Sequence, residues 1–422
     1  MDKLRPFQVP KVVHLQYGTS PSGNYTLRQH EAFLKAGFRS TLLSLYSSVT
    51  GDPRIKSLTK VAQLKSRVNQ KLQDIATKNR NKEYGAFSCS FIGSDVSNHP
   101  FIKEADYIYV HYVLGGFLSI RNLGQLAKLG KPLIIVMHDM WSITGGCSYS
   151  FECRKFNSHC GNCPILAGQK EEDLSYLQFK KKKSFYEKFD NLYFISPSNW
   201  LSDLAKKAEL TKNKPIFRIP NPIDRSLFKP FDKGTAKGIL NIAPEQYVIA
   251  FGANKITSPY KGWKYLQAAL QTLKQRNLDK NIIVLVFGAV ADQAFKDAIP
   301  FETRFMGFIS DDYTTNLIYN AADVFVAPSL ADNLPTTIIE SMCCGTPVVG
   351  FNNGGIPDMI KHKKNGYLAQ YKNEEDLAEG IEYCLNHRLI GNLSDEFSTE
   401  RIIEDHLNLY SYISKRQKNS AG

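Results

Sequence analysis

Two acidic side chains in the C-terminal third of the chain lie where a predicted strand ends and a helix begins, and carboxylates in such a place can accept hydrogen bonds from ligand hydroxyls. Asp332 follows the apolar run VFVAPS (324–329), and seven residues separate it from Glu340 in a helix that Pro335 is well placed to open. A carboxylate there can hold the two hydroxyls of a ribose through two hydrogen bonds. The simpler interpretation is that Glu340 only offsets the dipole at the start of its helix.

A glycine-bearing turn follows the same helix. The run PVVGF (347–351) predicts a strand, and Gly354 and Gly355 follow it just before Pro357. Backbone N–H groups left unpaired at the start of a helix can bind a phosphate or a sugar hydroxyl. The turn therefore adds an anion-binding element to the two carboxylates.

Two more polar sites come at the ends of predicted strands. Lys261 lies in the loop FGANKITSPYKGW (251–263), and His138 and Asp139 end the run PLIIVMHD (132–139). Many strand-end histidines are structural, and a loop lysine is ordinarily a solvated surface residue. Position alone therefore assigns neither residue a role.

Four of the eight cysteines cluster directly after His138, in the segment 145–164. Their spacing, C-x5-C-x6-C-x2-C, can supply four thiolates to a tetrahedral structural zinc ion, although the first pair is wider than in familiar zinc fingers. His159 is an alternative ligand. Three interpretations stay open: structural zinc, packed reduced cysteines, and a redox disulfide. The four thiols are those of Cys147, Cys153, Cys160 and Cys163.

The polar residues described above can form one site only if the fold brings the ends of their strands together. Short β-type runs alternate with helical patterns from KVVHLQYG (11–18) onward, and the pattern restarts at YVIAFGAN (247–254) after a Pro-rich connection. Such alternation predicts parallel sheets with helices on both faces, and ligands bind at the carboxyl ends of the strands.

We therefore expect an α/β fold of two doubly wound, Rossmann-like domains. Residues 1–215 form the first domain, with the Cys-rich insertion, and residues 216–395 form the second. A last helix in 396–422 is expected to pack back on the first domain. Asn221 and Asp224, in the connection, are expected to be structural.

The positive charge is concentrated in the first domain. Residues 1–215 hold 31 Lys and Arg against 17 Asp and Glu, whereas the remainder holds 22 against 23. This asymmetry favours an anionic partner, which can be nucleic acid, a membrane surface or a phosphorylated acceptor; a solvated surface without a partner is the alternative.

Basic stretches at 54–82 and 180–183 contribute to this charge. The first contains a predicted amphipathic helix with an apolar face made of Leu58, Val61, Leu64, Val68, Leu72 and Ile75. An anionic membrane surface would explain the mixture, and a solubilising helix face is the alternative. No apolar run reaches the ~18 residues that cross a bilayer, and the first residues lack an apolar leader. We expect a cytoplasmic protein, peripheral at the inner membrane face.

The segment 324–360 resembles glycosyltransferase family 4 of the GT-B fold. The resemblance rests on the acidic pair, on GTPVVG (345–350) and on GGIPD (354–358), with Asp332 in place of the usual Glu, as in some bacterial polysaccharide enzymes. It implies that Glu340 binds the nucleotide ribose. It also implies that Asp332 and the backbone at Asn333 and Leu334 face the donor sugar, with Gly354 and Gly355 near the sugar and diphosphate.

The same resemblance extends to other positions. Lys261 would neutralise the diphosphate, with Lys255 as a weaker candidate, and His138 would contact the donor sugar with Asp139 orienting it. Gly23, in the turn after the first strand, would approach the diphosphate. A similar Cys-rich insertion in colanic-acid-type transferases favours a structural role for the cysteines.

The expected function is retaining transfer of a sugar from a nucleoside diphosphate sugar to a saccharide or lipid-linked acceptor in polysaccharide biosynthesis. The sequence has no Asp-x-Asp, so we expect catalysis without a metal cofactor. Alternatives are an epimerase or phosphorylase of the same architecture. A nucleic-acid-binding protein lacks a recognition module here, and an oxidoreductase lacks G-x-G-x-x-G after a strand, so nucleic acid is not an expected partner.

Overall fold

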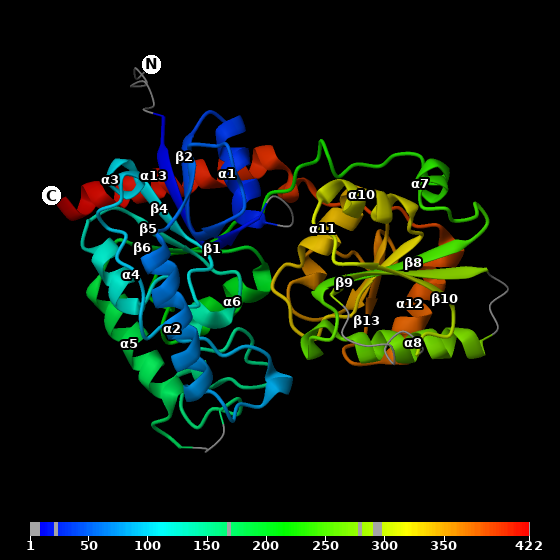
Figure 1. Ribbon diagram of the computed structural model, residues 1–422, viewed down its shortest axis with the longest axis horizontal. Coiled ribbons are helices and arrows are strands. Elements are labelled where there is room, and N and C mark those ends of the chain that lie inside the picture. Colours follow the sequence, from blue (N-terminus) through cyan, green and yellow to red (C-terminus); the bar gives the residue numbers. More distant parts are fainter. Residues whose placement is uncertain (1–8, 21–23, 167–169, 277–280, 290–297, 422) are drawn as a thin grey trace. The chain divides into compact units, whose positions relative to one another are not determined.

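A computed structural model describes residues 9–20, 24–166, 170–276, 281–289 and 298–421. The chain divides into two compact units (Figure 1): unit 1 is Met1–Pro222 with Thr399–Gly422, and unit 2 is Ile223–Ser398. The division lies after residue 222 instead of 215, because Ile216–Arg218 forms the last strand of the first sheet.

Unit 1 contains, in its described part, one parallel sheet with the strand order β3-β2-β1-β4-β5-β6-β7. The strands are β1 (Lys11–Thr19), β2 (Arg39–Ser47), β3 (Ile55–Ser57), β4 (Tyr107–Val110), β5 (Leu133–Val136), β6 (Leu192–Ser196) and β7 (Ile216–Arg218). The helices are α1 (Tyr25–Lys35), α2 (Lys60–Ala76), α3 (Pro100–Glu104), α4 (Ile120–Ala127), α5 (Leu174–Lys188), α6 (Asn199–Lys207) and α13 (Thr399–Ala421).

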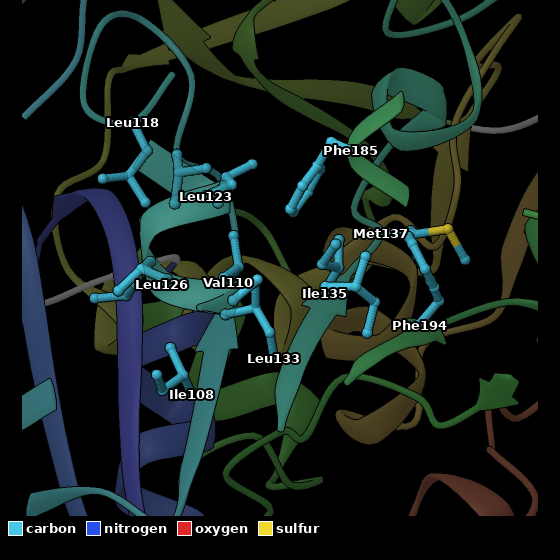
Figure 2. Packing of buried hydrophobic residues seen from close by; sticks show 14 of the residues in the cluster. Ile108, Val110, Leu118, Leu123, Leu126, Leu133, Ile135, Met137, Phe185 and Phe194 are labelled. Carbon is cyan, nitrogen blue, oxygen red and sulfur yellow. The ribbon is translucent and has the colours of Figure 1, made fainter. Parts of the chain in front are cut away.

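The central strands β4, β5 and β6 are buried on both faces, as the alternation of strands and helices predicts, whereas the edge strands β3 and β7 are more exposed. Figure 2 shows one face, where Ile108 and Val110 of β4 and Leu133 of β5 pack near Leu123 of α4 and Phe185 of α5. All five side chains are almost inaccessible to solvent. This core fixes the ends of β4 and β5, from which His111 and His138 project.

The last helix covers the other face of the same sheet. Ile402, Leu409 and Ile413 of α13 share a buried cluster with Val12 of β1 and Phe33 of α1. One aromatic and one polar contact of Tyr410 fix the register of the helix. Its ring stacks on Tyr107 with 3.9 Å between ring centroids, and its hydroxyl lies 2.8 Å from that of Tyr109. The C-terminal helix is therefore an integral part of unit 1.

Unit 2 has a parallel sheet with the strand order β10-β9-β8-β11-β12-β13 among its described residues. The strands are β8 (Tyr247–Lys255), β9 (Ile282–Ala289), β10 (Glu302–Gly307), β11 (Val324–Ala327), β12 (Val348–Phe351) and β13 (Gly366–Ala369). The helices are α7 (Lys233–Ile239), α8 (Trp263–Gln275), α10 (Asp312–Ala321), α11 (Thr336–Cys343) and α12 (Glu374–His387).

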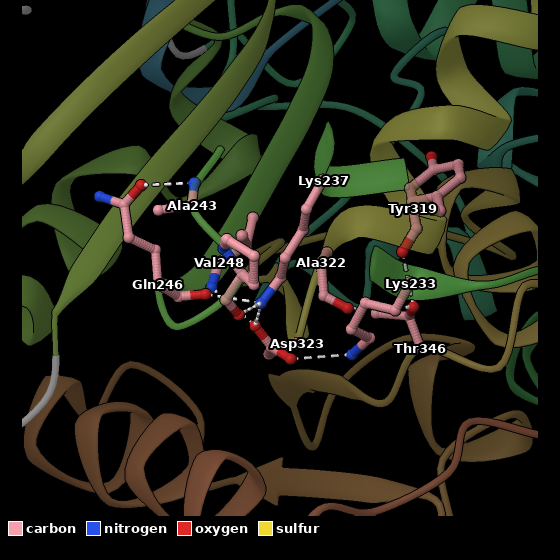
Figure 3. A network of polar contacts seen from close by, with 10 residues as sticks. Lys233, Lys237, Ala243, Gln246, Val248, Tyr319, Ala322, Asp323 and Thr346 are labelled. Carbon is pink, nitrogen blue, oxygen red and sulfur yellow. Dashed lines mark hydrogen bonds and ion pairs between the residues drawn. The ribbon is translucent and has the colours of Figure 1, made fainter. Parts of the chain in front are cut away.

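A carboxylate at the start of β11 ties the first helix of unit 2 to its sheet. Asp323 accepts a hydrogen bond from the backbone N–H of Val248 at 2.8 Å and pairs with Lys233 at 2.8 Å and Lys237 at 3.2 Å (Figure 3). Lys237 also donates to the carbonyl of Gln246 at 2.6 Å. This network holds the amino ends of β8 and β11 together, and it therefore helps to fix the position of the residues at their carboxyl ends.

Candidate functional site

Three loops meet at the carboxyl ends of β8, β11 and β12. The loop after β8 contacts the end of β11, since Leu330 donates its N–H to the carbonyl of Tyr260 at 2.7 Å. The turn after β12 contacts the same loop, since the Asn353 side chain donates to the carbonyl of Leu330 at 2.6 Å. The loops that carry Lys261, Asp332 and Gly354 thus form one interconnected site within unit 2.

Lys261 and Asp332 form an ion pair at the centre of this site. The lysine Nζ lies 2.6 Å from Asp332 Oδ2, and the two side chains are 26% and 12% exposed. Burial opposes protonation of Lys261, but the charge and hydrogen bond of Asp332 outweigh it, so the pKa of Lys261 is raised above its ordinary value. The pair places a protonated ammonium group at the carboxyl ends of the strands, where it can bind an anionic ligand.

Gly354 allows the turn after β12 to approach the Asp332 loop. Its φ is +61°, and a Cβ built at this position would lie 2.2 Å from the carbonyl oxygen of Asp332. Gly355 then donates its N–H to that same oxygen at 3.1 Å. A side chain at position 354 would separate the turn from the ion pair, so the glycine is required sterically.

Glu340 lies behind the loop, on α11. It is 4% exposed, and the hydroxyl of Tyr319 on α10 donates to its Oε2 at 3.0 Å. Pro335 is the residue that precedes the helix, so Glu340 comes a little over one turn after its start. Tyr319 was not identified from sequence, because a tyrosine within an apolar helix pattern gives no functional signal.

The other predicted ligands of unit 2 differ in exposure. Asn333 is 2% exposed, and Leu334 packs into the apolar core, which leaves its backbone as the part that can contact a ligand. Lys255 ends β8 with an exposed side chain. Gly23, in unit 1, lies outside the described residues.

His138 begins a row of three hydrogen-bonded imidazoles inside unit 1. Its Nε2 lies 3.1 Å from Nδ1 of His111, and Nε2 of His111 lies 3.0 Å from Nδ1 of His14. The Tyr25 ring packs on His138 with 3.8 Å between centroids. Burial lowers the pKa of His138 to about 3, and it lowers those of His111 and His14 well below their ordinary values.

The row ends on a small cavity. His111, His138, Asp139 and Trp141 line it together with apolar side chains of β4, β5 and α4. Nε2 of His138 is occupied by the hydrogen bond to His111, and the His138 side chain forms part of the cavity lining. His111 and His14 gave no sequence signal beyond lying in predicted strands.

Lys182 holds the turn that follows His138. It belongs to the run 180–183, which the sequence suggested as a basic surface, but Lys182 is 1% exposed. Its Nζ donates to the carbonyls of Trp141 and Thr144 and lies 3.5 Å from the centre of the Trp141 ring. Burial lowers its pKa to about 7. The signal was its helical spacing from Phe179, Phe185 and Tyr186, which are buried on the same face of α5.

The four clustered cysteines line one cavity of unit 1. All are free thiols, and Cys153 is the most exposed of them. Cys160 Sγ accepts the N–H of Gly145 at 3.2 Å, and burial raises the pKa of Cys160 to about 12. In the described parts of the chain, no three His, Cys, Asp or Glu side chains are arranged to hold a metal ion. The zinc hypothesis thus stays a prediction.

Comparison with known proteins finds a family model that matches part of unit 2 and relatives that match part of the chain. Residues 245–387 match the family model described as "Glycosyl transferases group 1". An uncharacterized glycosyltransferase of Haemophilus influenzae is 28% identical over 157 residues, which cover 35% of this chain and 44% of that protein. A D-inositol 3-phosphate glycosyltransferase of Actinosynnema mirum is 28% identical over 216 residues, which cover 46% and 51%. The chain thus matches about half the length of these relatives.

The fold is shared along nearly the whole chain. HepE of Anabaena, solved in complex with UDP and glucose, superposes with a TM-score of 0.60 and 16% identity over 96% of this chain and 100% of that one. These findings confirm the predicted resemblance to family 4 glycosyltransferases and the GT-B fold. No helix in the described residues is both long and apolar enough to pass through a membrane.

Proposed function

Starting from the resemblance to family 4, we propose that this protein is a glycosyltransferase. It moves a sugar from a nucleoside diphosphate sugar to a saccharide or lipid-linked acceptor in polysaccharide biosynthesis. The Lys261–Asp332 pair at the carboxyl ends of β8 and β11, inside the segment that matches the family, carries the proposal. The presence of UDP and glucose in HepE, a protein of the same fold, supports it.

The residues of unit 2 suggest how the donor is held. The Glu340 carboxylate accepts both ribose hydroxyls, and Tyr319 keeps it oriented through its 3.0 Å hydrogen bond. Lys261 turns from Asp332 toward the diphosphate, whose charge is larger than that of one carboxylate. Asp332 then accepts a hydroxyl of the donor sugar, and the turn at Gly354 and Gly355 approaches the sugar and the diphosphate.

The proposed reaction retains the configuration of the sugar. The bond between the anomeric carbon and the diphosphate oxygen breaks, and the acceptor oxygen bonds to the same face. The acceptor proton passes to the departing phosphate oxygen. Lys261 stabilises the charge that develops there, so we expect no divalent metal to be required. His138 contacts the donor sugar, as the resemblance implies.

A donor panel tests the proposal. Purified protein is incubated with UDP- and GDP-sugars, with and without saccharide acceptors, and release of the nucleoside diphosphate is measured. We expect release with at least one donor, and its loss in Glu340→Gln. Binding of no nucleotide in thermal-shift and calorimetric titrations contradicts the function. Activity abolished by a chelator and restored by Mg²⁺ or Mn²⁺ contradicts only the metal-free mechanism.

A further inference from the structure

Helix α2 of unit 1 exposes its apolar face. Val61, Leu64, Val68, Leu72 and Ile75 recur at helical spacing on one side, and each is between 40% and 68% exposed. The sequence predicted this apolar face, and in the structure it does not pack on the sheet. An unburied stripe of five large apolar side chains on one helix marks a contact surface.

The opposite face explains why the helix cannot turn its apolar side inward. Ala62, Ser66 and Asn69 are the buried residues of α2. Ser66 donates to the carbonyl of Gly115 at 2.6 Å, and Asn69 Oδ1 accepts the N–H groups of Phe91 and Ile92 at 2.8 and 3.0 Å. A rotated helix would leave these backbone groups unpaired and bury charge, so the outward stripe is a fixed feature.

Steric fit supports the same orientation. A Cβ built on Gly116 would lie 2.6 Å from Cβ of Asn69 and 2.9 Å from Cα of Ser66. The helix therefore lies directly against the backbone of the 115–116 loop. Leucine or valine at positions 66 or 69 would push it away, which is why the inward face is small and polar.

The apolar stripe is bordered by positive charge. Lys60, Lys65, Arg67 and Lys71 are all exposed on α2, where Asp74 is the one acidic residue. Over residues 54–82 the sequence has nine Lys and Arg against this single aspartate. The aliphatic part of a lysine side chain lies along apolar surface while its ammonium group reaches outward. The stripe and the charges can therefore contact a single partner surface that has an apolar layer beneath a charged one.

We propose that α2 docks unit 1 on an anionic lipid bilayer, with its apolar stripe among the acyl chains and its lysines at the headgroups. An apolar stripe flanked by Lys and Arg is the pattern of helices that lie in a membrane interface. The excess of positive charge around the stripe, with Asp74 as the one acidic residue of α2, matches anionic lipid headgroups. Docking by α2 goes beyond the transfer reaction and does not depend on it.

Vesicle binding tests the proposal with the full chain and no substrate. The fraction of protein that sediments with vesicles is measured for two compositions, pure phosphatidylcholine and phosphatidylcholine mixed with roughly a third phosphatidylglycerol. Each is measured at low and at physiological salt. Lys65→Gln with Lys71→Gln is expected to weaken binding to the anionic vesicles about 25-fold, about fivefold for each lysine. Leu64→Gln with Ile75→Gln is expected to weaken it at least ~tenfold at either salt concentration.

Ile390→Gln is the matched control, because Ile390 is 70% exposed in unit 2. It is expected to bind like the unchanged protein, and all variants are expected to keep the thermal unfolding temperature. Equal binding to neutral and anionic vesicles overturns the proposal, and so does full binding by both α2 double variants. A dimer that the Leu64/Ile75 variant dissociates, without vesicle binding, assigns the stripe to a second copy instead.

Discussion

Mild acidification is expected to destabilise unit 1, because it buries four uncharged histidines. His14, His30, His111 and His406 are each at most 6% exposed. Burial lowers the pKa of His30 to about 4 and that of His406 to about 3, and it lowers those of His14 and His111 well below the ordinary value. Unfolding releases all four rings to titrate in water.

The size of the effect follows from the difference in proton uptake. An unfolded histidine takes up a proton near its ordinary pKa of about 6.5, whereas these rings stay neutral in the folded unit. Their stabilisation is complete above that pH and is lost as the pH falls toward the folded-state values. Between pH 7 and 5.5 the loss is about 1.3 kcal/mol per histidine, or about 5 kcal/mol for four, against a typical stability of about 5–15 kcal/mol.

Tryptophan fluorescence can report on unit 1 alone. The variant Trp263→Phe leaves Trp141 and Trp200, which are both in unit 1. In this background, urea unfolding is measured at several pH values between about 7.5 and 5.5. His30→Gln is expected to reduce the slope of unfolding free energy with pH by about 1.2 kcal/mol per unit near pH 5.5. His387→Gln, on the exposed surface of α12, is the control and is expected to leave the slope unchanged.

The slope decides the outcome. Near pH 5.5 it should correspond to uptake of about four to five protons on unfolding, since His138, whose pKa burial lowers to about 3, adds to the four. A free energy of unfolding that stays constant over this range would refute the reasoning, since the buried rings would then be taking up protons in the folded state. A slope that His30→Gln does not change would show that other groups cause the pH dependence.

Three further predictions concern the ion pair, the ribose carboxylate and the cysteines. Lys261→Met is expected to destabilise unit 2 by about 3–5 kcal/mol, since Asp332 is left buried and unpaired. Adding Asp332→Leu should restore thermal stability but not nucleotide binding, and no recovery would contradict this account. Glu340→Gln is expected to weaken UDP binding about tenfold or more, since hydrogen bonds to a charged group are worth about 1.5–3 kcal/mol. Tyr319→Phe should weaken it less, and equal losses in calorimetry would oppose the assignment. The zinc hypothesis predicts about one equivalent of metal and thiols that react only after chelation; less than ~0.2 equivalents would leave packed cysteines.

The strand-end residues of unit 2 were largely predictable, because local patterns determine them. Pro335 ahead of a helix, a glycine turn after a buried strand and a loop lysine each have one common geometry in a parallel sheet. Their meeting follows from the strand order β8-β11-β12, which brings the three loops side by side. The ion pair between Lys261 and Asp332 could be found only in the structure, because the partners are 71 positions apart in the sequence.

The sequence did not determine which side chains of a helix are buried and which face solvent. Periodicity placed the apolar residues of α2 on one face, but it could not show that Asn69 and Ser66 have backbone partners that turn this face outward. For Lys182 the sequence suggested an exposed side chain, but the structure buries it. Its Nζ contacts two backbone carbonyls and one aromatic ring within residues 141–144, and these contacts offset the cost of burial. In both cases partners distant in sequence decide the outcome.

The path of the chain through the two units sets the order in which they can form during synthesis. Unit 2 is continuous, from Ile223 to Ser398, whereas unit 1 needs the helix that follows it. Until residues up to Ile413 have left the ribosome, Val12 and Phe33 lack the apolar cover that α13 supplies. Although N-terminal domains generally fold first, here unit 2 can fold completely before the last helix of unit 1 has been synthesised.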